Sequence, residues 1–467
     1  MLTRGVEAFS STASLRCFQL DTRAQPPAVQ PVGIMDSEAL LEAITADSHT
    51  HISFLQRLVQ AASPNPPGDT RAAAAVIRDY LSSQHNIQTQ VIAPGWERAP
   101  NVVAEFPCGV TDGPRLAMNG HLDVFPAGDG KDWGCSPWSG DIVDGRLFGR
   151  GTVDMKAGTA ASVIAFAYLH RHRAHLRGSV ALCAVSDEET GGKLGTRWLL
   201  GHDENGNELA NGERSKWAGD VAINAEPGGL NTIRFAEKGT LRLTFTVDTG
   251  PGAHGAFTHL NKSATRIAAQ LISDLAVVET IVPDLDPGLK EYLEREDVRQ
   301  AIDKSMGKGA ADIAMKCTLN IGTLQGGLKV NMIPGHCVFE ADIRMPLGLE
   351  ADHVMTVIQK VLENYPQAKV DIQTAASNPA AACAHDHPMV DILARHAQRV
   401  TGRKPLAIPS MGATDCKFYR YHGIPAYIFG VPPDTMGAKD ERVLIEDFLA
   451  VIKTHALAGW EYLGGSS

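Results

Sequence analysis

The sequence lacks the long apolar runs that membrane proteins carry. Its apolar stretches, such as residues 160–166, stay well short of the roughly 20 residues that a membrane-spanning helix needs. It also lacks a basic block of the kind that nucleic-acid-binding proteins present, because 43 lysines and arginines stand against 53 acidic residues, for a net charge of −10. The sequence therefore argues against both nucleic acids and membranes as partners.

Cysteine is sparse as well. The chain has eight cysteines among 467 residues and no CxxC pair, which excludes a dense disulfide framework and is typical of a reducing compartment. We therefore expect a cytoplasmic protein. Residues 1–35 contain three arginines among serines and threonines, followed by prolines. We interpret this segment as a disordered leader, and a mitochondrial import signal is the alternative.

The pattern of apolar segments predicts two domains, as the length of the chain also suggests. Strand-like segments alternate with helical segments up to residue 236, which predicts an α/β layered sheet. Residues 237–377 then follow the order strand, helix, strand, strand, helix, strand, with a charged insertion at 283–307, which predicts a ferredoxin-like βαββαβ unit. From residue 378 the chain returns to the first pattern. We therefore predict an α/β domain made of residues 36–236 and 378–467, interrupted by an inserted domain at 237–377.

Polar side chains follow three of the predicted strands. His121 and Asp123 come after residues 115–120, Glu188 and Glu189 come after residues 180–185, and Glu226 comes after residues 220–225. In open α/β sheets, functional groups gather at the carboxyl ends of the strands. A further acid, Asp154, opens the helical segment at 156–170. Several carboxylates at one edge of a sheet would repel one another unless cations neutralised them. The sequence therefore predicts a metal site at this edge.

Each of these residues has a simpler interpretation when it is taken alone. Asp154 could cap a helix, His121 could be an ordinary hydrogen-bonded histidine, and Glu188 and Glu189 could be solvated charges. Their convergence favours the metal site, and a mixture of histidine and carboxylates with open positions suits catalytic zinc, with cobalt or manganese as substitutes. Asp123, two residues after His121, can orient the imidazole from the same face of an extended segment. Because Glu188 and Glu189 are adjacent and point differently, one can bind metal while the other accepts a proton.

Five motifs together resemble a known family. They are HLDVFP at 121–126, WxxxPWSG at 133–140, DGRLFGRGTVDMKAG at 144–158, SDEETGG at 186–192 and AEP at 225–227. The sequence resembles the two-zinc amidohydrolases and metallopeptidases, which include acetylornithine deacetylase, succinyl-diaminopimelate desuccinylase, aminoacylase and glutamate carboxypeptidase. The resemblance extends over most of residues 52–455 in the family's order. It implies a mixed-sheet zinc-peptidase catalytic domain with an inserted lid or dimerisation domain.

The resemblance also implies roles for the residues at the strand ends. Asp154 would bridge two metals, His121 and Glu226 would complete one site, and Glu189 would belong to the other. Glu188 would act as general base and then as general acid, while Asp123 would orient His121. Two cations would lower the pKa of water and polarise the amide carbonyl.

In the inserted domain, the resemblance implies that His254 reaches into a partner subunit's site and stabilises the oxyanion. Asn331 and Arg344 would contact the substrate, and the arginine suits a substrate carboxylate. The loop that contains Thr414 would contact the same end of the substrate. These roles imply a homodimer.

One departure from the family puts the second metal in doubt. Members usually carry a final metal-binding histidine shortly before an acidic pair that is matched here by Asp440 and Glu441, yet residues 431–439 contain no histidine. Asp434 is the nearest oxygen donor and is our candidate replacement. The alternative is a single tightly held metal.

The sequence thus predicts a metal-dependent hydrolase with one or two zinc ions per subunit, cobalt or manganese being possible. Its expected substrates are small molecules, namely N-acyl amino acids or short peptides with a free carboxylate. The alternative is a non-hydrolytic pseudoenzyme or binding protein that has lost a full second metal site.

Overall fold

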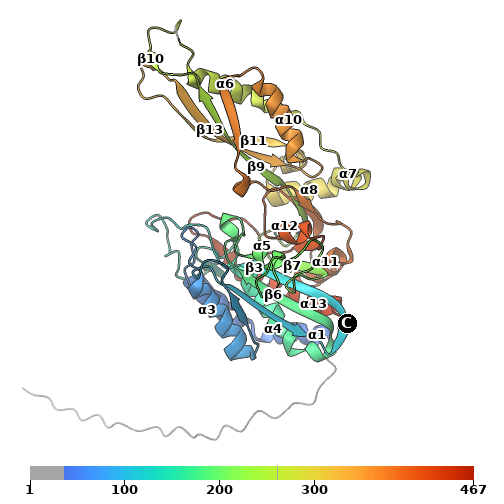
Figure 1. The fold of residues 1–467 in the computed structure, drawn as a ribbon. Helices are drawn as coiled ribbons and strands as arrows, with labels where there is room; N and C mark the ends of the chain where they lie inside the picture. Colours follow the sequence, from blue (N-terminus) through green and yellow to red (C-terminus); the bar gives the residue numbers. More distant parts are fainter. Residues whose placement is uncertain (1–35, 204, 260, 467) are drawn as a thin grey trace, which may run out of the picture. The chain divides into compact units, whose positions relative to one another are not determined.

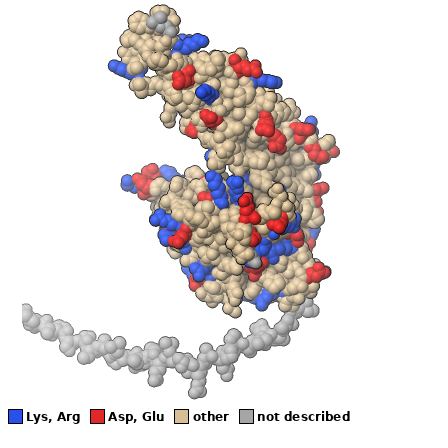
Figure 2. Space-filling model, in the orientation of Figure 1, with Lys and Arg blue, Asp and Glu red and all other residues tan. Residues whose placement is uncertain are grey.

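The structure is a computed structural model that describes residues 36–203, 205–259 and 261–466. The predicted leader, residues 1–35, lies outside these ranges. Within them, no helix combines the length and the apolar character that crossing a bilayer requires. Acidic and basic side chains are interspersed over the face shown in Figure 2, in keeping with the absence of a basic block from the sequence.

A nine-stranded mixed sheet is the largest sheet of the described residues (Figure 1). The parallel strands that matter most for the site are β6 (Arg177–Val185), β3 (Val110–His121), β7 (Val221–Asn224) and β17 (Ala426–Ile428), which are neighbours in this order. The sheet is completed by β1 (Gln90–Ile92), β2 (Asn101–Pro107), β8 (Thr232–Glu237), β15 (Ala381–Ala382) and β16 (Leu406–Ser410). Because β2 and β8 run antiparallel to their neighbours β6 and β17, the sheet is mixed, as predicted.

Helices cover this sheet, and one of them approaches it very closely. The alanine-rich helix α4 (Lys156–Arg171) is buried over nearly its whole length. A Cβ atom at Gly158 would lie only 2.2 Å from the main-chain oxygen of Ala225, so glycine is needed where the helix passes the end of β7. The other helices of this part are α1 (Ser37–Ala46), α2 (Ser48–Gln60), α3 (Arg71–Asp79), α5 (Thr196–Gly201), α11 (Pro388–Thr401), α12 (Cys416–Tyr421) and α13 (Ile445–Tyr462).

Strand β8 was not predicted from the sequence. All six of its residues are buried, but two of them, Arg234 and Glu237, are charged. Their charges interrupt the apolar run by which a buried strand is recognised. The tertiary structure supplies both side chains with partners, so the strand is stable despite its charges.

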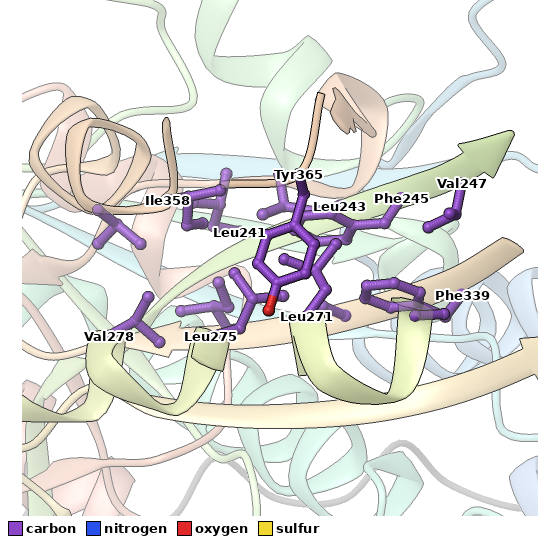
Figure 3. Packing of buried hydrophobic residues seen from close by; sticks show 14 of the residues in the cluster. Leu241, Leu243, Phe245, Val247, Leu271, Leu275, Val278, Phe339, Ile358 and Tyr365 are labelled. Atoms are coloured by element: carbon purple, nitrogen blue, oxygen red, sulfur yellow. The ribbon is translucent and has the colours of Figure 1, made fainter. Parts of the chain in front are cut away.

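A four-stranded antiparallel sheet forms the second layer, in the order β11 (Thr318–Gly326), β13 (His336–Met345), β9 (Gly239–Asp248) and β14 (Ala368–Ile372). With helices α6 (Ala264–Leu275) and α10 (Ala351–Leu362), the chain order is βαββαβ, as predicted. Alternate residues of β9 point into the core, where Phe245 stacks on Phe339 with ring centroids 4.7 Å apart (Figure 3). Leu271 of α6 and Ile358 of α10 pack in the same cluster.

The charged insertion forms helices α7 (Pro287–Glu294), α8 (Glu296–Met306) and α9 (Ala310–Ile313). Asp286 caps the first of them, and Pro287 occupies its first turn. The hydroxyl of Tyr292 donates to the main-chain oxygen of Ala407 at 2.8 Å, which attaches α7 to β16. The short strands β4 (Ile142–Val143), β5 (Arg146–Phe148) and β18 (Arg442–Leu444) pair with one another, as do β10 (Ala253–His254) and β12 (Met332–Ile333). The exact domain limits, 36–236, 237–377 and 378–467, stay a prediction.

Candidate active site

Three of the predicted metal ligands meet at one edge of the large sheet. His121 ends β3, Glu226 follows β7, and Asp154 lies two residues before α4. The Nε2 atom of His121 lies 3.1 Å from Oδ1 of Asp154 and 3.4 Å from Oε1 of Glu226. One ligand atom from each of these residues lies within 4.8 Å of the others. The parallel pairing of β3 with β7 causes this meeting, because it brings their carboxyl ends to the same edge.

The imidazole of His121 is oriented by a main-chain oxygen. Its Nδ1 atom lies 2.8 Å from the carbonyl oxygen of Asp123, whereas the carboxylate of Asp123 is 3.7 Å away. With its proton on Nδ1 donated to this carbonyl, the ring presents the lone pair of Nε2 to the space between Asp154 and Glu226.

The carboxylate of Asp123 instead holds the neighbouring turn. It accepts hydrogen bonds from the main-chain N–H groups of Glu188 at 3.2 Å and Glu189 at 3.1 Å, and from the amide of Asn65 at 2.9 Å. The sequence predicted an aspartate beside His121 that orients the ring, but it did not show that this side chain would fix the position of the two glutamates.

Glu188 and Glu189 occupy a single 3₁₀ turn, Glu188–Thr190, after β6. Asp187 enters the turn in the left-handed region at φ 73°, where its side chain accepts hydrogen bonds from the Thr190 hydroxyl and the Leu194 N–H. Oε1 of Glu189 is buried and has no hydrogen-bond partner among the residues that the structure describes. A buried carboxylate oxygen without a donor is costly, and a cation would remove that cost.

The pKa shifts of the acidic residues in the site also indicate a bound cation. Burial, together with a smaller contribution from the charge of Asp154, raises the pKa of Glu226 to about 7 and that of Glu189 to about 8. Burial also raises the pKa of Glu188 well above its usual range. Burial lowers the pKa of His121, but the carboxylates of Glu226 and Asp154 outweigh it, and the net shift is strongly upward. The acids thus need positive charge, which a divalent cation supplies.

The donor set fits one such cation well. His121, Asp154 and Glu226 offer one nitrogen and two carboxylate groups, which are ligand types for zinc, cobalt or manganese. Glu189, the other predicted ligand near the turn, is not a member of this group of three. Asp434 is not brought to this group: it is exposed and lines a separate cavity of about 850 Å³ with Glu446 and Asp447.

Glu441, which follows the segment 431–439, holds the main chain of Asp154 in position. The buried carboxylate of Glu441 accepts hydrogen bonds from the main-chain N–H groups of Val153 at 2.8 Å and Asp154 at 3.2 Å. Its other oxygen forms an ion pair with Arg150 at 2.5 Å, and Arg150 also donates to the carbonyl of Gly437 at 3.1 Å. Glu441 and Arg150 therefore set the main-chain position of Asp154, a contribution that sequence analysis missed.

The predicted residues of the inserted domain are not members of the His121 group. His254 is on β10, and the N–H of Gly255 donates to the carbonyl of Asn331 just before β12. Both His254 and Asn331 are exposed. Arg344, on β13, donates to Asp342 at 3.0 Å and to the hydroxyl of Thr240 at 3.2 Å.

Thr414 is held by Glu237, the last residue of β8 in the nine-stranded sheet. Its N–H and hydroxyl donate to the two carboxylate oxygens of Glu237, at 3.1 and 2.9 Å. Glu237 also forms a fully buried ion pair with Arg420 at 2.9 Å. A charge inside a buried strand was the only sequence signal for this arrangement.

Comparison with known proteins agrees with this geometry. The model of Peptidase family M20/M25/M40 matches residues 117–459. Succinyl-diaminopimelate desuccinylase from Rhodospirillum centenum is 30% identical over 404 residues, which cover 85% of this chain and 93% of that protein. A probable succinyl-diaminopimelate desuccinylase from Staphylococcus epidermidis is 26% identical over 81% of this chain and 90% of its own length.

Solved structures show the same fold. An M20-family metallo-carboxypeptidase from Sulfolobus solfataricus superposes with a TM-score of 0.72 at 20% identity, covering 89% of this chain and 98% of that one. Human carnosine dipeptidase 1 gives a TM-score of 0.69 at 17% identity, covering 94% and 100%. The family match, the relatives and the site geometry lead to one conclusion: this chain belongs to Peptidase family M20/M25/M40 and is a metallohydrolase that acts on amide bonds.

Proposed function

We propose that this metallohydrolase cleaves the amide bond of N-acyl amino acids or small peptides that carry a free carboxylate. The observation that carries the proposal is the meeting of His121, Asp154 and Glu226 within 4.8 Å beside the turn of Glu188 and Glu189. The named activities of its relatives, a desuccinylase, a metallo-carboxypeptidase and a dipeptidase, support this choice of substrate class.

In this proposal His121, Asp154 and Glu226 hold a zinc ion, and cobalt or manganese can replace it. A bound cation of this kind polarises the substrate carbonyl and lowers the pKa of water. Glu188 takes a proton from the attacking water and returns it to the nitrogen of the leaving amine. Asp123 keeps Glu188 in place through the main-chain hydrogen bond described above. Glu189, with its unpartnered buried oxygen, is the ligand available to a second ion.

The substrate carboxylate is assigned to Arg344. Two of its donors are engaged with Asp342 and Thr240, which holds the planar guanidinium in one orientation. Thr414 and Asn331 are the other proposed substrate contacts. His254 is exposed on β10, and we assign it to the site of a partner subunit in a homodimer, where it stabilises the oxyanion.

The test is a Glu188→Gln variant offered N-acetyl and N-succinyl amino acids and dipeptides in the presence of zinc, cobalt or manganese. We expect the wild type to release free amine and the variant to release it about 10²- to 10⁴-fold more slowly, because only the proton transfer is lost. Zinc affinity, measured by calorimetry, should change little.

Glu363→Gln, which alters an exposed glutamate at the end of α10, is the matched control and should retain full activity. An unchanged rate in Glu188→Gln would remove Glu188 from the mechanism. A wild type that binds zinc but releases no amine from any of these compounds would contradict the proposed substrate class.

A further inference from the structure

A chain of buried polar groups runs beneath the proposed metal site. The N–H of Glu226 donates to Oδ1 of Asn224 at 2.6 Å, and the amide of Asn224 donates to Oδ1 of Asn119 at 2.9 Å. The amide of Asn119 donates to the hydroxyl of Thr196 at 2.9 Å, which donates to Oδ2 of Asp415 at 2.8 Å. The chain therefore connects Glu226 with an aspartate far away in the sequence.

Every donor in this chain points away from Glu226 and toward the carboxylate of Asp415. Hydrogen bonds that are aligned in this way polarise one another, and a charged acceptor at the end strengthens them. The members come from four elements: Asn119 from β3, Asn224 from β7, Thr196 from α5, and Asp415 from the residue before α12.

This chain of hydrogen-bonded side chains lies entirely inside the protein. Its five residues are at most 6% exposed, and both asparagines are fully buried between apolar neighbours on β3 and β7. Buried amides destabilise a fold unless every bond is made. Apolar side chains could fill this space, but they could not hold the N–H of Glu226 in a fixed direction.

We propose that Thr196, Asn119 and Asn224 are positioning residues that set the main chain of Glu226 from the anchor at Asp415, and so set the affinity of the site for its cation. Asp415 belongs to the same loop as Thr414, whose neighbour Glu237 is itself anchored by Arg420. The hydrogen-bond chain thus joins the loop of Thr414 and Asp415, proposed to contact the substrate, to the proposed metal ligand Glu226. This inference rests on the proposed function, because it takes Glu226 as a ligand.

The test is a Thr196→Val variant, which replaces the hydroxyl by a methyl group two side chains away from Glu226. We expect its zinc dissociation constant, measured by calorimetry, to rise about tenfold. Losing a direct hydrogen-bond partner of a metal ligand typically costs 10- to 100-fold in affinity, and Thr196 acts through Asn119 and Asn224, so we expect the lower end of this range. Thr196→Ser keeps the hydroxyl and should bind zinc within twofold of the wild type. The melting temperature of each metal-free variant checks that the fold is intact.

Thr454→Val is the matched control, because Thr454 is fully buried in α13 and its hydroxyl has no partner within the described residues. It should bind zinc like the wild type. If Thr196→Val does not fold, Thr196→Ala removes the same hydroxyl without adding a methyl group.

The possible results separate the positioning role of these side chains from the proposed function of the protein. Wild-type zinc affinity in the folded Thr196→Val or Thr196→Ala variant would overturn the positioning role while leaving the proposed function intact. An equal loss of affinity in Thr454→Val would overturn it as well. A wild type that binds no zinc, cobalt or manganese would overturn the proposed function itself.

Discussion

The carboxylates around His121 compete with protons for any cation that enters the site. In the absence of metal, burial raises the pKa of Glu226 to about 7 and that of Glu189 to about 8, so both groups hold protons over much of the range near neutrality. A cation must displace these protons before the oxygens can bind it. Metal binding and proton release are therefore coupled at this site.

We expect zinc binding at pH 6.5 to release at least one proton, and zinc affinity to rise steadily from pH 6 to pH 8. Calorimetry in buffers of different ionisation enthalpy measures the number of protons released. Glu189→Gln removes one of the titrating groups and should reduce that number. A zinc affinity that is constant between pH 6 and pH 8 would contradict the coupling.

The same pKa shifts affect the stability of the metal-free protein. Because the pKa values of Glu226 and Glu189 are raised in the folded state, that state binds more protons than the unfolded chain between about pH 5 and pH 8. His121, whose pKa is also raised, acts in the same direction. Stability from these three groups is therefore lost as the pH rises, and a cation that binds only the folded state would offset the loss.

A buried charge pair, Glu237 with Arg420, links strand β8 to helix α12. Glu237 and Arg420 contribute side chains that are only 1% exposed, and Arg420 also donates to the main-chain oxygens of Ala426 and Arg234. Removing one partner of such a pair leaves an uncompensated charge in the interior, which is more costly than never having had the pair.

We expect Glu237→Gln to lower the free energy of unfolding by about 3–5 kcal/mol, the usual cost of breaking a buried ion pair. Urea denaturation followed by circular dichroism gives this value. Asp129→Asn breaks the exposed pair between Asp129 and Lys131 and is the control, which should unfold like the wild type. A similar result for both variants would show that the buried pair contributes no more than a surface pair.

On the scale of the whole molecule, exposed apolar side chains gather in the segment that joins β11 to β12. Leu328 is 91% exposed, Val330 is fully exposed and Leu324 of β11 is 55% exposed. Strand β11 is also an edge of the four-stranded sheet, and unpaired edges favour association with another chain. Exposed apolar groups that are clustered in this way mark interaction surfaces, which supports the proposed homodimer.

We expect light scattering after size-exclusion chromatography to give twice the mass of one chain for the wild type. The double substitution Leu328→Asp and Val330→Asp should shift the protein to the mass of one chain, because charges in an apolar interface are costly to bury. Val282→Asp alters an 82% exposed valine outside this segment and should leave the dimer intact. A wild type that is monomeric at micromolar concentration would contradict the proposal.

The sequence by itself determined the strand ends and the residue types that occupy them. His121, Glu188 and Glu226 come shortly after short, mainly apolar runs, and such runs end where a buried strand leaves the sheet. Alternation along 241–247 and helical spacing in 351–362 likewise identified the ferredoxin-like unit. These signals are local, because each depends on a periodicity of a few residues.

Only the tertiary structure decided which polar residues are brought together. Thr196 meets Asp415 across 219 positions, and Glu237 meets Arg420 across 183 positions. It also left Asp434, chosen because it was the nearest oxygen donor along the chain, outside the His121 group. The physical reason is that partner choice among buried polar groups depends on how sheets and helices pack, and neither periodicity nor distance along the chain records that packing.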